Sequence, residues 1–176
     1  MLLNELFDAK LDELEMIPNV NFGTDEEHEV KLRDYLSFPG IVKFPVFNNH
    51  YFTINVVPDG SYNRIIVTTP NDNIVGYIVA RGLITRAGKA LQIYATWISS
   101  KHRGMNLAAA IYVTLSKQLQ ALIVSDESHT ASGARIWKRG LPSLGYDPRV
   151  FSLSANNFVD DEDPYNDADL VWAFEA

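Results

Sequence analysis

The sequence contains no cysteine in its 176 residues. Disulfide bridges, zinc–thiolate centres and a cysteine nucleophile are therefore excluded, and the composition is compatible with a reducing compartment. Long hydrophobic runs are also absent, because no apolar segment approaches the roughly 20 residues of a membrane-spanning helix. The opening stretch, MLLNELFDAKLDELE, is acidic and amphipathic, unlike a secretory signal peptide. We expect a soluble, cytoplasmic protein.

Positive charge is scarce as well. The chain has 15 Lys and Arg against 22 Asp and Glu, a formal net charge of -7. Such a chain lacks broad attraction for nucleic acid or anionic membrane, and we expect neither as a partner. The few histidines show no ligand spacing, so no metal site is expected. Hydrophobic residues make up 47% of the sequence, enough for the core of one ordinary domain without crosslinks.

The hydrophobic pattern predicts an α/β (α+β) domain over residues 1–176. Helical patterns occur at residues 2–15 and from a cap at Thr24 to a stop before Pro39. Branched and aromatic runs then predict strands between about 41 and 98, in the segments YFTINVV, RIIVTT, IVGYIVA and ALQIYATWI. They are followed by a helix to about 119, a strand at 121–124, a helix at roughly 130–139, and the closing strands PRVFSLS and ADLVWAF. The expected parts are N-terminal helices (1–40), a sheet core (41–153), and an acidic loop with a closing strand (154–176).

The junction SSKHRGMNLAAAIY, residues 99–112, lies where a predicted strand gives way to a helix. The amino end of a helix carries unpaired amides and about half a positive charge, which together favour an anion. A close approach needs small residues, and Gly104, Asn106 and Ala108 are either small or tolerant of unusual backbone angles. Three basic residues add charge: Lys101, His102 and Arg103. These features favour a diphosphate site, and an ordinary helix start with surface bases is the alternative.

Residues 103–108, RGMNLA, resemble the acetyl-CoA pyrophosphate loop of the GCN5-related N-acetyltransferase (GNAT) superfamily. The family pattern is Arg or Gln, two residues, Gly, one residue, then Gly or Ala. Arg103 and Ala108 match its ends, and Asn106 stands where the pattern has Gly. Because Asn tolerates a left-handed backbone better than most residues, we expect the loop to form.

A second segment, SDESHTASGARIWKRG at residues 125–140, more loosely resembles the family's helix along the pantetheine arm. That alignment puts Thr130, Gly133 and Trp137 in the places of an Asn, an Ala and a Tyr. Thr130 can still hydrogen-bond the arm. Trp137 cannot protonate a departing thiolate, because an indole N–H is not a useful acid.

The resemblance covers roughly residues 62–153 and implies a central mixed, mostly antiparallel twisted sheet, flanked by helices and splayed between strands four and five. It implies a transferase, an acyltransferase that moves an acetyl group from acetyl-CoA to an amine acceptor by direct attack. The acceptor would be a small molecule or a protein amine, and an oligomer is compatible with this function. Backbone amides near Trp97 and Ile98 would polarise the thioester. The implied cofactor-binding set is Trp97, Ile98, Arg103, Gly104, Met105, Asn106, Leu107, Ala108, Thr130 and Trp137.

The catalytic acid and base remain unassigned, because the fourth strand, ALQIYATWI, contains no Asp or Glu. Asp126, just past the next strand, is either the base or a turn residue that caps exposed amides. Three tyrosines are alternatives for the acid or core residues: Tyr94, Tyr112 and Tyr146.

A second function also stays open. The departures at Asn106 and Trp137 would suit a catalytically weak or inactive, phage-encoded protein of the same fold that serves as a structural or partner-binding component. The six acids of residues 160–169 would attract a cationic acceptor, bind calcium, or form a solvated loop.

Overall fold

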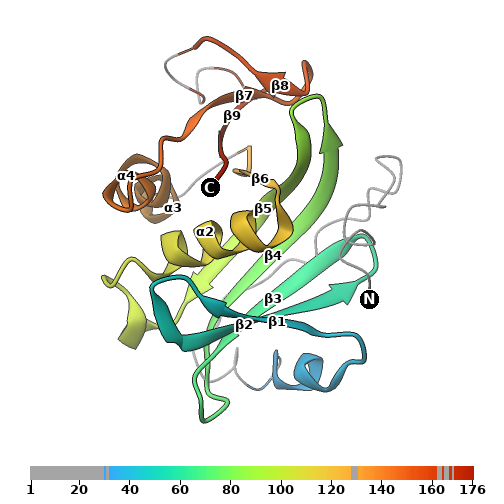
Figure 1. The fold of residues 1–176 in the computed structure, drawn as a ribbon, viewed down its shortest axis with the longest axis vertical. Coiled ribbons are helices and arrows are strands. Elements are labelled where there is room, and N and C mark those ends of the chain that lie inside the picture. The colour runs from blue at the N-terminus through green and yellow to red at the C-terminus, as the bar shows by residue number, and fades with distance from the viewer. Residues whose placement is uncertain (1–29, 31, 128–130, 162–163, 165–166, 168) are drawn as a thin grey trace.

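The computed structural model of the protein describes residue 30 and residues 32–127, 131–161, 164, 167 and 169–176 (Figure 1). The helical pattern expected at residues 2–15, the cap expected at Thr24, and Thr130 lie outside these described residues, as does part of the acidic segment 160–169. The segment before Pro39 ends in a short 3-10 helix, η2 (Asp34–Ser37), as the stop signal predicted.

Five strands follow η2: β1 (Val42–Val46), β2 (Asn49–Asp59), β3 (Tyr62–Thr68), β4 (Ile74–Thr85) and β5 (Gly88–Ile98). The junction follows as a 3-10 turn, η3 (Ser100–His102), and a helix, α2 (Leu107–Leu119). The rest comprises β6 (Leu122–Val124), α3 (Ala131–Arg135), the π-helical η4 (Ile136–Gly140), α4 (Leu141–Ser143), β7 (Arg149–Ser152), β8 (Asn157–Phe158) and β9 (Leu170–Phe174). No helix in this part of the chain is long and apolar enough to cross a membrane.

The described strands form one sheet in the order β1-β2-β3-β4-β5-β6-β9-β7-β8. Every neighbouring pair is antiparallel except β5 and β6, which run parallel. Short turns join consecutive strands from β1 to β5; Gly60, for example, adopts a φ of 61° in the two-residue loop between β2 and β3. The mixed α/β fold with a mostly antiparallel sheet is therefore as predicted.

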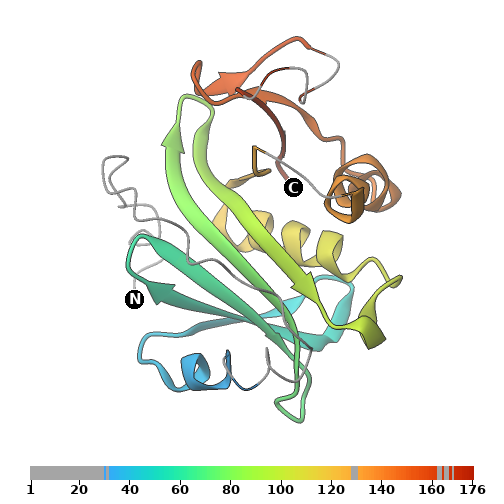
Figure 2. The same cartoon turned by 180° about the vertical axis from the view of Figure 1, so that it is seen from behind.

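Two apolar clusters cover the two faces of the sheet. Ile65 and Val67 point to the face that packs against α2, whereas Ile66 points to the opposite face, as the two-residue period of a strand requires. Leu32, together with Tyr35 of η2, covers that opposite face. Figure 1 shows α2 in front of the sheet, and the view from behind in Figure 2 shows the strands in front of the helix.

Strands β5 and β6 part early. They pair over only three positions, from Ala90 with Leu122 to Gln92 with Val124. On its other edge β5 carries a β-bulge at Tyr94, because Ile93 pairs with Ala80 of β4 while Ala95 pairs with the adjacent Val79. Bulges bend a strand and increase its twist. The expected splay between strands four and five is thus present between β5 and β6, with the bulge two residues past their last pair.

The segment predicted as one helix at 130–139 differs in detail. Its described part is α-helical over Ala131–Arg135, π-helical to Gly140 and again α-helical to Ser143. Single turns of π-helix are rare and occur frequently at functional sites. Strands β1 and β8 were not delimited from sequence. Pro45 weakens the strand signal of β1, which lies at the edge of the sheet, where proline is tolerated.

Candidate functional site

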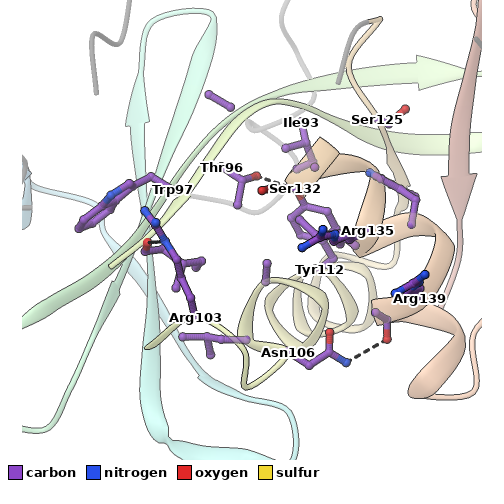
Figure 3. A pocket seen from close by; sticks show the side chains of 18 of the residues that line it. Ile93, Thr96, Trp97, Arg103, Asn106, Tyr112, Ser125, Ser132, Arg135 and Arg139 are labelled. Atoms are coloured by element: carbon purple, nitrogen blue, oxygen red, sulfur yellow. Dashed lines mark hydrogen bonds between the residues drawn. The ribbon is translucent and has the colours of Figure 1, made fainter. Parts of the chain in front are cut away.

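A cavity of about 1160 Å³ opens where β5 leaves β6 (Figure 3). Its walls come from the second half of β5, the loop before α2, the first turns of α2, the two residues that follow β6, and the segment α3–η4–α4. Ligand pockets typically measure about 300–1,000 Å³, so this volume suits a ligand as large as a nucleotide cofactor.

Most residues of the predicted cofactor-binding set lie together at this cavity. Eight of the ten line it: Trp97, Ile98, Arg103, Gly104, Asn106, Leu107, Ala108 and Trp137. Met105 is half exposed and is not among the lining residues, and Thr130 is outside the described part of the chain. The junction and the loosely matching downstream segment therefore form walls of the same cavity, although they are far apart in sequence.

The loop before α2 has the backbone that its small residues predicted. Gly104 has a φ of 82°, and Asn106 adopts the left-handed conformation with φ 58° and ψ 28°. Asn106 is the N-cap of α2, yet its side chain makes no capping hydrogen bond to that helix. The first amides of the 13-residue helix are thus left unoccupied by the cap, as an anion site at a helix start requires.

The Asn106 side chain reaches the other wall instead. Its Nδ2 donates to the carbonyl of Gly140 (3.0 Å) and to Oγ of Ser143 (2.9 Å). Gly140 fits closely beneath it, because a Cβ atom there would lie 2.7 Å from Oδ1 of Asn106 and 3.2 Å from Cβ of Ala109. Figure 3 shows this contact between the loop and the helical segment.

We expect Gly140→Ala to destabilise the protein by about 1–3 kcal/mol, the usual cost of overpacking a tight contact. The added methyl group would displace the Asn106 amide or separate the two helices. Urea unfolding measures the change. The matched comparison is the same substitution made on Asn106→Gly, where the closest clash is removed and the cost should fall. An equal cost in both backgrounds would contradict the assigned contact.

The cavity is basic on an acidic protein. His102, Arg103, Arg135 and Arg139 line it, and the only carboxylate among its described lining residues is that of Asp126. Arg103 approaches from the loop before α2, whereas Arg135 and Arg139 belong to the opposite helical wall (Figure 3). Neither Arg135 nor Arg139 was predicted from the sequence as a site residue. Their spacing of four residues was the available signal, because such residues share one side of a helix.

Arg103 is anchored at the end of β5, where its Nε donates to the carbonyl of Ile98 (3.0 Å). The same strand shows which amides face the gap. The amide of Ser99 donates to Val75 of β4 (2.9 Å), and main-chain groups alternate in direction along a strand. It follows that the amides of Ile98 and Thr96 point to the open edge, and that of Trp97 points into the sheet. Of the predicted pair, only Ile98 offers its amide to the cavity.

The inner part of the cavity contains Tyr112, which is buried. Its hydroxyl shares a hydrogen bond of 2.6 Å with Oγ1 of Thr96, and burial raises the pKa of Tyr112 far above its usual value. Its ring packs 5.6 Å from that of Trp137, measured between ring centroids. Burial therefore favours the neutral hydroxyl of Tyr112, which either donates or accepts in this hydrogen bond.

The other two tyrosines have different surroundings. Tyr94, at the bulge, lines the cavity, and its hydroxyl donates to Oε1 of Gln92 (3.1 Å). Burial raises the pKa of Tyr94 as well. Tyr146 is not among the lining residues and packs against Phe174, with ring centroids 5.8 Å apart. This contact supports the packing interpretation for Tyr146.

Asp126 combines features of both interpretations weighed for it. Its Oδ1 accepts a hydrogen bond from the amide of Glu127 (2.7 Å), as a turn residue does. It also lines the cavity and is partly buried, and this burial raises the pKa of the Asp126 carboxyl above its ordinary value. Glu127, by contrast, is exposed and is not a lining residue. A carboxyl with a raised pKa beside a cavity is suited to proton transfer.

No protein-family model and no curated protein sequence matches the chain. Solved structures similar to it include a GNAT superfamily phosphinothricin acetyltransferase from Sinorhizobium meliloti in complex with AcCoA. Its TM-score is 0.36 at 15% identity, over 65% of this chain and 60% of that one. NAA60 of Arabidopsis thaliana in complex with a bisubstrate analogue has a TM-score of 0.36 at 12% identity, over 85% of this chain and 90% of that one. Both TM-scores are low.

Proposed function

We propose that this protein is an acetyl-CoA-dependent N-acetyltransferase that transfers an acetyl group to an amine. The observation that carries the proposal is the cavity at the parting of β5 and β6, lined by the uncapped start of α2 and by four basic side chains. A basic, cofactor-sized cavity on a chain of net charge -7 favours a polyanionic ligand.

The proposed cofactor position follows from these walls. The diphosphate of acetyl-CoA would lie on the first amides of α2 beside Arg103, with Arg135 and Arg139 available to its other phosphate oxygens. The pantetheine arm would occupy the gap that the splay leaves between β5 and the α3–η4 wall, beside Trp137. The thioester carbonyl would accept hydrogen bonds at the open edge of β5, where the amides of Thr96 and Ile98 point.

The reaction needs few protein groups. The neutral amine nitrogen bonds to the acetyl carbon, the carbon–sulfur bond breaks, and the proton that the nitrogen loses on becoming an amide passes to the departing CoA thiolate. An alkylammonium acceptor must first lose a proton, and we assign this step to Asp126. Its place at the cavity and its raised pKa support the role. Tyr112 shares its hydroxyl hydrogen bond with Thr96 and packs against Trp137, the residue that replaces the family's tyrosine.

Binding of CoA tests the proposal directly. The full chain should show a thermal shift with CoA, and at 100 times its dissociation constant the ligand should stabilise the fold by about 2.7 kcal/mol. Calorimetry gives the dissociation constant. Inorganic pyrophosphate at the same concentration controls for unspecific anion binding and should shift the midpoint less. No shift at millimolar CoA would overturn the enzyme proposal.

A non-catalytic protein of the same fold is the second candidate, and Trp137 is the observation that favours it. The indole is buried and packs between Tyr112 and Phe174, with centroid distances of 5.6 Å and 6.1 Å, so it serves the core. A screen of amines with acetyl-CoA and thiol detection separates the two candidates. CoA binding without thiol release from any amine would support the non-catalytic candidate.

A further inference from the structure

We infer that Asn106 is a positioning residue that ties together the two walls of the cavity and thereby sets the affinity for CoA. The inference rests on the proposed function and names a further determinant of the same site. One wall is the loop before α2 with the start of that helix, and the other is the end of η4 with α4. Asn106 is bonded to Gly140 and Ser143, which lie 34 and 37 residues further along the chain.

The side chain of Asn106 is unusual for an asparagine at an N-cap. Asn at an N-cap ordinarily accepts a hydrogen bond from an amide of its own helix. Asn106 makes no such bond, and its amide group instead donates to the opposite wall. The contact leaves the first amides of α2 available to an anion and holds them at a fixed distance from the helical wall. A residue that capped α2 would compete with the diphosphate for the same amides.

The residue that lies against the Asn106 side chain is a glycine, Gly140. Gly140 has helical backbone angles, φ -63° and ψ -55°, so no left-handed conformation explains a glycine there. Glycine inside a helix costs about 1 kcal/mol relative to alanine. A glycine at position 140 is explained by lack of space, because a Cβ atom there would lie 2.7 Å from Oδ1 of Asn106. Ser143 completes the contact, since its Oγ donates to the carbonyl of Gly140 (2.7 Å). Three residues on two walls are therefore fitted to one another.

The backbone conformation of Asn106 is one that suits glycine as well. Asn106 has a φ of 58°, a conformation that glycine adopts without strain. Asn106→Gly therefore keeps the loop conformation accessible and removes the side-chain tie. At this position the family pattern has glycine, so the substitution also isolates what the asparagine adds.

The experiment measures CoA affinity by calorimetry for the full-length wild type, Asn106→Gly and a matched control. The control is Asn156→Gly. Asn156 also has a left-handed backbone, φ 57°, and its Nδ2 also donates to a main-chain carbonyl, that of Ile84 (3.4 Å). It is not among the residues that line the cavity. Both substitutions thus remove an amide side chain from the same backbone conformation.

We expect Asn106→Gly to raise the dissociation constant of CoA about 10-fold, the weight of one to two hydrogen bonds, while Asn156→Gly leaves it unchanged. In turnover assays the KM for acetyl-CoA should rise with little change in kcat. An affinity equal to that of wild type would overturn the inference. If Asn106→Gly fails to fold, Gly140→Ala disturbs the same contact from the other wall and should weaken CoA binding too. Failure of wild type itself to bind CoA would instead refute the proposed function.

Discussion

Arg103→Glu is expected to abolish the stabilisation of the protein by CoA. The substitution removes a guanidinium at the start of α2 and puts a carboxylate beside the proposed diphosphate position. Loss of a charge-assisted hydrogen bond, together with like-charge repulsion, should weaken binding on the order of 100-fold or more. Thermal shift and calorimetry with CoA measure the effect.

The matched control for this prediction is Lys101→Glu. It changes the net charge by the same amount two residues away, but Lys101 is exposed and is not among the residues that line the cavity. Because Lys101 is exposed and makes no contact with the cavity, salt screens its charge, and Lys101→Glu should weaken CoA binding much less than Arg103→Glu. Equal losses in the two variants would mean that the general field of the protein, and no specific contact, attracts the cofactor.

Asp126→Asn is expected to lower kcat about 10²- to 10⁴-fold while leaving CoA affinity unchanged, because it removes the proposed base and keeps an acceptor for the Glu127 amide. Among the described residues, Glu127 on its own loop and Tyr94 on β5 interact electrostatically with Asp126, and Arg135 of α3 lines the same cavity. Wild-type kcat should fall as the pH drops through the raised pKa of Asp126. The pH profile of kcat for Asp126→Asn should lack this fall.

The control for Asp126→Asn is Glu127→Gln, which removes the same charge one residue along the chain. Glu127 is exposed and outside the cavity lining, so its substitution should leave kcat near that of wild type. If Asp126→Asn retained full activity, another group or water would have to be the base. If Glu127→Gln lowered kcat equally, the effect would be one of local charge.

The pH dependence of protein stability provides an independent test of the raised pKa of Asp126. Burial raises its folded-state pKa above the unfolded value, so the folded protein binds the proton more tightly. The free energy of unfolding contributed by this group therefore falls as pH rises from the unfolded pKa through the folded pKa, and stays lower above it. Asp126→Asn should accordingly be at least as stable as wild type at pH 7. A variant that gains stability while losing turnover is typical of a functional residue.

The central strands were predictable because their signals are local. Branched and aromatic runs with turn residues between them identified β2 to β5, and the small residues near Gly104 identified the loop before α2. The left-handed backbone of Asn106 was predictable for the same reason, since it depends on the residue type itself.

The features that could not be predicted from the sequence depend on contacts between distant residues or have weak local signals. The bond from Asn106 to Gly140 joins residues 34 positions apart, and no periodicity reports such a partner. The π-helical turn of η4 and the two-residue strand β8 are too short for a pattern to emerge. Arg135 and Arg139 were not predicted as site residues, because only the fold brings them to the same cavity as Arg103.

The bulge at Tyr94 also reverses the side-chain alternation of β5. Ile93 packs in the cluster against α2, whereas Ala95, two residues later, packs on the opposite face. The reversal sets Thr96 against Tyr112 and the ring of Trp97 in the opposite layer. Loss of one residue at the bulge would restore regular pairing and keep these faces, whereas one residue added beyond the bulge would exchange the faces of those that follow.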